Sequence, residues 1–116
     1  MMLDWNDYRK QLAVGVKEIG QLSPSTIKGY AALSAAGQKS DLLGAKVREL
    51  IALAVAVTLR CDGCITVHTE AAIKRGATKE EIAEALEVAT TINASKAIWT
   101  RPIARADPGG WVTPRF

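Results

Sequence analysis

Histidine, cysteine and aromatic residues are scarce in this sequence. Its 116 residues include one histidine and two cysteines, and 5% of them are aromatic. The cysteine pair has no second Cys/His pair of the kind that structural zinc sites use. Basic residues exceed acidic ones by three, but the two kinds are interleaved along the chain and form no helical stripe of Lys and Arg. With so few aromatics for base stacking, this pattern argues against a nucleic-acid-binding protein.

Long apolar runs are also absent. The longest, Leu50 to Val57, has eight residues, whereas a membrane-spanning helix needs about 18 or more. The first ten residues carry acids and no apolar signal core, so we expect no export, no membrane partner and a cytoplasmic location. We expect a single domain over residues 1–116, in which Arg101 to Phe116, with three of the four prolines, forms an extended tail.

The reactive residues that are present all lie between Glu49 and His68. These twenty positions hold both cysteines, at 61 and 64 in a CDGC sequence, and the only histidine. A thiol reacts as its thiolate, so reactivity requires that the anion be stabilised. In a reducing cytoplasm, a CxxC pair is more typical of catalysis than of a structural crosslink. This stretch is therefore the candidate functional site.

The pattern places these groups at a break between two helices. Leu50 to Leu59 reads as one helix, and we expect Asp62 to cap the next, whose first amides would stabilise a thiolate at Cys64. Cys64 and His68 are four positions apart and share a helix face. Cys61 and Cys64 are close enough for a disulfide if the turn is tight. A nucleophile, a base within reach and a resolving thiol are typical of a peroxide or disulfide reductase.

Two other interpretations of these residues stay open. The two cysteines, His68 and Glu49 could supply four zinc ligands. Alternatively, the cysteines could be buried and unreactive, with His68 satisfied in the core and Glu49 an ordinary solvated acid. Glu49 begins a run with no other charge before Arg60, which favours a role in the site.

The rest of the chain predicts further helices and no strand, so the fold class is all-α, with about five to six helices. We expect a first helix from Asp4 to Ile19, stopped by Gly20, and a second that Ser23 caps and that ends before Gly37. A third helix holds Glu49, and a fourth follows the CxxC turn and ends at Arg75 and Gly76. The last helix begins at a Thr78–Glu81 capping box and ends at Pro102.

The apolar helix predicts self-association. Because every residue from Leu50 to Val57 is apolar, the helix has no polar face and should be buried all round. A domain of this size rarely surrounds a helix by itself, so we expect a homo-oligomer whose partner subunits cover one side. We also expect Tyr30, on the second helix, to lie in the core.

Glu49, Cys61, Cys64 and His68 together carry a family resemblance. Their spacing, E-x11-C-x2-C-x3-H, resembles the signature of the carboxymuconolactone decarboxylase superfamily in its AhpD-like alkylhydroperoxidase branch. The segments RELIALAV and GATKEEIAEALEVA are similar to that family as well. The resemblance covers roughly Ser23 to Ala97, which is most of the chain.

This resemblance implies an all-α domain that assembles into trimers or hexamers. It implies that Cys64 attacks a peroxide, that Cys61 resolves the sulfenic acid, and that Glu49 with His68 relays protons. The redox-active dithiol would serve in place of a cofactor or metal. The substrate would be a hydroperoxide or a small disulfide, and the reductant a thiol protein or a low-molecular-weight thiol. The best-known peroxidases of the family carry a second histidine where this sequence has Gly63.

Two rival functions remain open. One is lactone decarboxylation, which the superfamily name implies but which has no need of a second sulfur. The other is a non-catalytic, redox-sensing oligomer whose dithiol only switches assembly.

Overall fold

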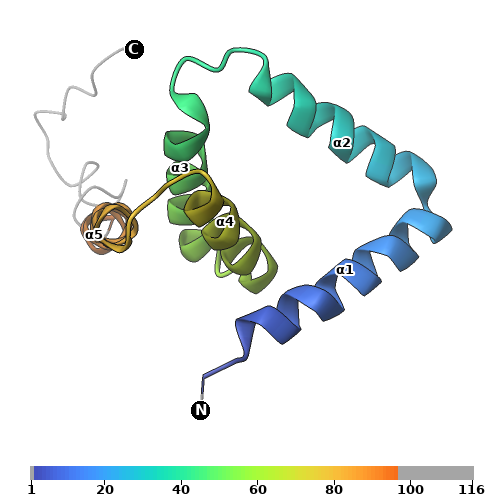
Figure 1. Ribbon diagram of the computed structural model, residues 1–116, viewed down its shortest axis with the longest axis horizontal. Helices are drawn as coiled ribbons and strands as arrows, with labels where there is room; N and C mark the ends of the chain where they lie inside the picture. The colour runs from blue at the N-terminus through green and yellow to red at the C-terminus, as the bar shows by residue number, and fades with distance from the viewer. Residues whose placement is uncertain (1, 97–116) are drawn as a thin grey trace, which may run out of the picture.

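The computed structural model of the protein describes residues 2–96, which form five α-helices and no strand (Figure 1). They are α1 (Trp5–Leu22), α2 (Pro24–Gln38), α3 (Gly44–Leu59), α4 (Asp62–Lys74) and α5 (Lys79–Ser95). The all-α prediction is thereby confirmed. None of the described helices has the length and apolar character needed to span a bilayer. The predicted tail from Arg101, and the predicted helix end at Pro102, lie outside the described residues.

Two predicted helix ends are confirmed because local hydrogen bonding sets them. At the start of α5, Thr78 Oγ1 accepts from the Glu81 N–H at 3.1 Å, and Glu81 Oε2 accepts from the Thr78 N–H at 2.9 Å. This reciprocal pair is the predicted capping box. At the end of α4, Arg75 is the C-cap, and Gly76 adopts a φ of +90° that glycine tolerates without strain.

The predicted ends of the first two helices were wrong. α1 continues past Gly20 to Leu22, and a Cβ on Gly20 would lie 3.5 Å from Ile27 Cγ1. Gly20 therefore lies inside the helix, close to the first turns of α2, rather than stopping it. α2 continues to Gln38. Ser23 does occupy the N-cap position of α2, but its Oγ pairs with a threonine hydroxyl and not with a backbone amide.

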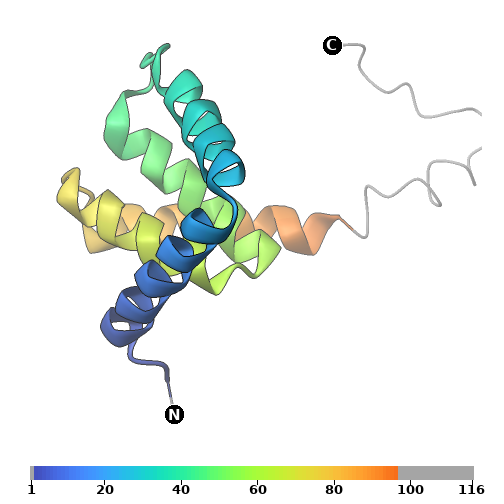
Figure 2. The same ribbon diagram turned by 90° about the vertical axis from the view of Figure 1, so that its right-hand side faces the viewer.

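The helices divide into a packed group and an arm. α3 lies against both α4 and α5, and α1 lies against α4 (Figures 1 and 2). α2 extends from the far end of α1 and packs on no other helix. The α3–α4 pair is therefore the centre of the domain, and it carries the CxxC turn between its two helices.

The interior of a single chain is small. Among the described residues, Leu53, Ala56, Thr66, Ala72 and Ala89 are buried. The α3 helix keeps an open side in the single chain: Ile51 is 48% exposed and Val55 is 51% exposed. The burial of this side by partner subunits stays a prediction. The prediction for Tyr30 was wrong, because α2 packs only on α1 and leaves Tyr30 66% exposed.

Candidate active site

The CxxC motif lies at an abrupt reversal between α3 and α4. Arg60 adopts left-handed backbone angles, φ 55° and ψ 40°, and its N–H donates to two carbonyls of the last turn of α3. The Cys61 N–H donates to the Ala56 carbonyl at 3.1 Å, which closes α3. α4 then begins directly at Asp62. The turn is therefore as tight as disulfide formation requires.

The N-cap of α4 is Cys61 and not Asp62, which corrects the sequence prediction by one residue. Cys61 Sγ accepts the Cys64 N–H at 3.2 Å. Asp62 already has helical backbone geometry, and its acid lies in the first turn, where it is favourable to the helix dipole. The sulfur that receives a direct helix N–H is consequently that of Cys61.

The two cysteines are bonded to each other. Cys61 and Cys64 form a disulfide with their Cα atoms 5.2 Å apart, within the usual range for such a bond. Whether this disulfide is reversible stays a prediction. Among residues 2–96, no group of three or more His, Cys, Asp or Glu side chains is arranged to hold a metal ion.

His68 and Glu49 form a direct pair across the two central helices. His68 Nδ1 lies 2.7 Å from Glu49 Oε2, and the two side chains are 33% and 25% exposed. Because the carboxylate holds Nδ1, it also sets the orientation of the ring and leaves Nε2 for other partners. His68 is one turn after Cys64 on α4. Of the four residues singled out in the sequence, the structure thus joins the two cysteines directly, and joins the acid to the imidazole.

One neighbour of the motif was missed by sequence reasoning. Leu12, on α1, packs onto the helix start at Gly63, where a Cβ would lie 3.1 Å from Leu12 Cδ2 and 3.5 Å from Leu12 Cδ1. A side chain at position 63 would have to displace this leucine. Helical periodicity predicts that Leu12 faces a neighbouring helix, but it does not identify which residue it touches. α1 therefore covers one side of the CxxC turn.

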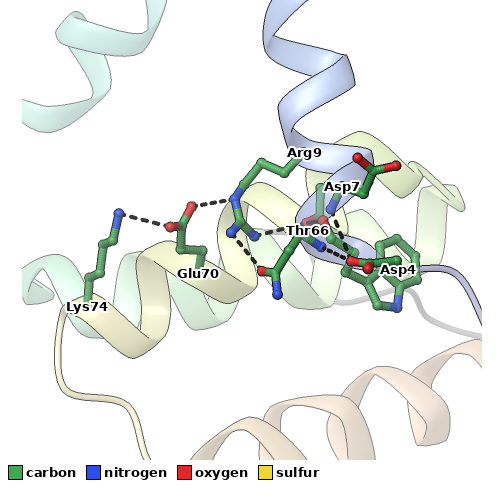
Figure 3. Close-up of polar contacts among 8 residues, drawn as sticks. Asp4, Asp7, Arg9, Thr66, Glu70 and Lys74 are labelled. Carbon is green, nitrogen blue, oxygen red and sulfur yellow. Dashed lines mark hydrogen bonds and ion pairs between the residues drawn. The ribbon is translucent and has the colours of Figure 1, made fainter.

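A polar cluster holds α1 in that place (Figure 3). Arg9 Nε donates to Glu70 Oε2 at 2.9 Å, and Arg9 Nη1 donates to Thr66 Oγ1 at 3.4 Å. Thr66, which is buried, donates its hydroxyl to the Trp5 carbonyl at 3.2 Å. Hydrogen bonding from Lys74, with the charge of Arg9, lowers the pKa of the Glu70 carboxyl. These contacts join α1 to α4 close to the reactive turn.

The sequence matches a family model over a range that includes this site. The profile of the carboxymuconolactone decarboxylase family matches residues 24–106. The chain belongs to that family. The match begins at α2 and includes the whole of α3, the CxxC turn, α4 and α5. The family includes decarboxylases and alkylhydroperoxidases.

A solved structure of the same family is similar to this chain, and so are two curated relatives. A carboxymuconolactone decarboxylase family protein from Legionella pneumophila, solved in its apo form, is 32% identical, with a TM-score of 0.72 over 76% of this chain and 79% of that one. An uncharacterized Haemophilus influenzae protein is 44% identical over 62% of this chain and 64% of its own length. A Cupriavidus necator protein is 37% identical over 60% and 62%. The chain thus matches less than two thirds of the length of these two curated relatives.

Proposed function

We propose that this carboxymuconolactone decarboxylase family member is a thiol-dependent peroxidase or disulfide reductase that cycles the Cys61–Cys64 pair. The observation that carries the proposal is the disulfide at a helix start one turn from an imidazole that a carboxylate orients. This arrangement offers two sulfurs, a proton acceptor and a group that holds it in place.

In the proposed oxidation, Cys64 is the attacking sulfur. Its thiolate attacks one peroxide oxygen, the O–O bond breaks, and the alkoxide that leaves takes a proton to become an alcohol. His68 first accepts the thiol proton and then returns it to the alkoxide, while Glu49 holds the ring. Cys64 is left as a sulfenic acid. The Cys61 thiol attacks that sulfur, and the disulfide forms with release of one water.

In the proposed reduction, two external thiols restore the dithiol. The first attacks Cys64 Sγ and expels Cys61 as a thiolate, and the second releases the mixed disulfide as a small disulfide product. The N–H of Cys64 supports this order, since it points at Cys61 Sγ and would stabilise the anion that leaves. The reductant would be a low-molecular-weight thiol or a thiol protein, which fits a cytoplasmic location.

Mass spectrometry after stoichiometric hydroperoxide tests the proposal. The reduced wild type should lose two hydrogens. The Cys61→Ser variant should gain one oxygen at Cys64, and the Cys64→Ser variant should stay unmodified at matched peroxide. A wild type that keeps both alkylatable thiols would exclude the redox function. Reaction of Cys61 in the Cys64→Ser variant would exchange the roles of the two sulfurs.

Activity assays on the wild type and on the same variants separate the two rival functions. A lactone decarboxylase would retain its activity in the Cys61→Ser variant, because decarboxylation needs no second sulfur. A redox-sensing oligomer would change its assembly when the disulfide forms, and in excess dithiothreitol it would not raise the rate of peroxide consumption above that of dithiothreitol alone. Continuous peroxide consumption well above that background therefore supports catalysis.

We also propose that the active form is a homo-oligomer, a trimer or larger. Apolar side chains line a groove of about 320 Å³ between α3 and α5, among them Ile51, Val55 and Ile92. On α2, Tyr30 and Leu33 are 66% and 73% exposed. Such unpartnered surface is unusual on a stable monomer. Light scattering should therefore give at least three times the 12.4 kDa chain mass, and a monomer at micromolar concentration would contradict the proposal.

A further inference from the structure

A second pocket adjoins the candidate active site on the side of Glu49. It has a volume of about 220 Å³ and lies where the end of α2, the start of α3 and the end of α4 meet. Its lining residues are Gln38, Asp41, Ala45, Arg48, Glu49 and Arg75. Glu49 is thus shared between this pocket and the pair with His68.

The two arginines of this pocket are not engaged by protein acceptors. Within residues 2–96, the side chains of Arg48 and Arg75 make no ion pair or hydrogen bond. Arg9 shows the contrast, since it bonds to an acid, an amide and a hydroxyl and holds two helices together (Figure 3). A guanidinium group has five N–H donors in a planar fork that fits a carboxylate. The donors of Arg48 and Arg75 are therefore available to an anion.

The acids of the pocket do not neutralise these arginines by contact. Glu49 Oε2 is bonded to His68 Nδ1, and Asp41 makes no ion pair in the described part of the chain. Arg75 follows α4, where a basic residue also favours the helix dipole. That preference does not explain why Arg48, from another helix and 27 positions earlier, lines the same pocket.

The pocket lies in line with the reactive sulfurs along α4. With a rise of about 1.5 Å per residue, His68 is about 6 Å beyond Cys64 along the helix axis, and Arg75 about 16 Å beyond it. His68 thus stands between Cys64 and Arg75 along α4, and Glu49, which is bonded to His68, lines the pocket. A linear molecule of this length, with one reactive and one acidic end, could reach from Cys64 to the pocket.

We propose that Arg48 and Arg75 bind the carboxylate of an acidic, chain-like substrate whose peroxide or disulfide reacts at Cys64. This assignment rests on the proposed redox function and names the substrate class for it: hydroperoxides or disulfides of medium- and long-chain carboxylic acids. Arg48, which is half-buried, is the principal anchor, and the exposed Arg75 closes the other side of the pocket.

Binding is tested without any redox step by calorimetric titration of the oxidised 116-residue chain. Octanoate is the probe, and octanamide and acetate are its uncharged and short counterparts. We expect octanoate to bind at least tenfold more tightly than either one. Arg48→Gln should weaken octanoate binding about tenfold or more, and the exposed Arg75→Gln, which should not disturb folding, about threefold or more. A Lys17→Gln/Lys79→Gln variant removes two charges outside the pocket and should change little.

Three results would overturn the inference. Equal affinities for octanoate and octanamide would show that the arginines do not recognise the negative charge of the carboxylate. Equal affinities for acetate and octanoate would indicate a site for free anions rather than for a substrate tail. An equal loss in the Lys17/Lys79 control would assign the effect to net charge.

A kinetic comparison tests whether the carboxylate that the arginines bind belongs to the substrate that reacts at Cys64. For a fatty-acid hydroperoxide, Arg75→Gln should raise KM about threefold or more and leave kcat unchanged, and the methyl ester should show no difference between variant and wild type. If octanoate binds as expected but no peroxide is consumed, the proposed function fails while the carboxylate pocket remains. If peroxides are consumed and octanoate does not bind, only the pocket assignment fails.

Discussion

The contact between Leu12 and Gly63 allows a sharp test of how α1 covers the reactive turn. Histidine at position 63 adds six heavy atoms to a place where even a Cβ would lie 3.1 Å from Leu12 Cδ2. Overpacking of this kind costs about 1–3 kcal/mol. Leu12→Ala alone should cost about 1–2 kcal/mol, because Leu12 is only half-buried and the full cost of such truncations is about 2–5 kcal/mol.

The Gly63→His/Leu12→Ala double variant should lose less unfolding free energy than the two single variants lose together. Removing the leucine side chain makes room for the imidazole, so we expect a favourable coupling free energy of about 1 kcal/mol or more. With a urea dependence of about 1.5 kcal/mol/M, this coupling corresponds to a shift of about 0.7 M in the unfolding midpoint. Circular dichroism at fixed protein concentration measures the four midpoints.

Gly63→Ala is the matched control for this cycle. Its single Cβ needs Leu12 to move by only a few tenths of an ångström, so its coupling to Leu12→Ala should be much smaller. If the Gly63→His and Leu12→Ala losses simply add, within about 0.5 kcal/mol, the packing of α1 on the CxxC turn is refuted.

Two further predictions concern the ionisable groups. His68→Gln and Glu49→Gln should each slow the reaction of Cys64 with hydroperoxide by about ten- to a thousandfold, and wild-type rates by stopped flow would reduce both residues to structural roles. Hydrogen bonding from Lys46 lowers the pKa of Glu81 below its usual 4.5. The Lys46–Glu81 pair therefore stabilises the fold fully above pH 4.5, and this stabilisation is lost as the pH falls through the lowered pKa of Glu81. Thermal melts from pH 6 to pH 3 should then show a smaller decline for Glu81→Gln than for the wild type, and parallel declines would contradict the linkage.

The sequence predicts those parts of the structure that neighbouring residues determine. The Thr78–Glu81 capping box and the glycine stop at Gly76 appear where predicted, because each needs only a few adjacent backbone groups. The proximity of Glu49 and His68 follows from the helix–turn–helix pattern, since a short turn returns α4 along α3.

Helix boundaries near the turn could not be predicted to the residue. Aspartate is a far more common N-cap than cysteine, so the sequence favours Asp62. The structure chooses Cys61 because the left-handed Arg60 and the bond from the Cys61 N–H to Ala56 end α3 so abruptly that the next helix begins at once. The left-handed φ of a single residue, Arg60, decides this shift.

The helical spacing of apolar residues does not predict which residues far apart in the sequence touch each other. The spacing of apolar residues shows that Leu12 faces another helix, but not that it faces Gly63. Likewise, nothing in the local sequence brings Arg48 and Arg75 to one pocket. The open faces of α2 and α3 arise for a related reason, since the sequence records that a surface is apolar but not whether the same chain covers it.

The corrected N-cap changes how the two sulfurs divide the proposed chemistry. The first helix N–H available to sulfur points at Cys61 Sγ, so a thiolate there is stabilised by the backbone alone. Cys64 lacks that bond, and in the proposed mechanism His68, one turn later on α4, would remove its proton. A sulfur held as a stabilised anion is a good leaving group, and a sulfur with an adjacent base is a good nucleophile. The same pair can therefore favour attack by Cys64 during oxidation and departure of Cys61 during reduction, with the Glu49–His68 contact needed only for the first.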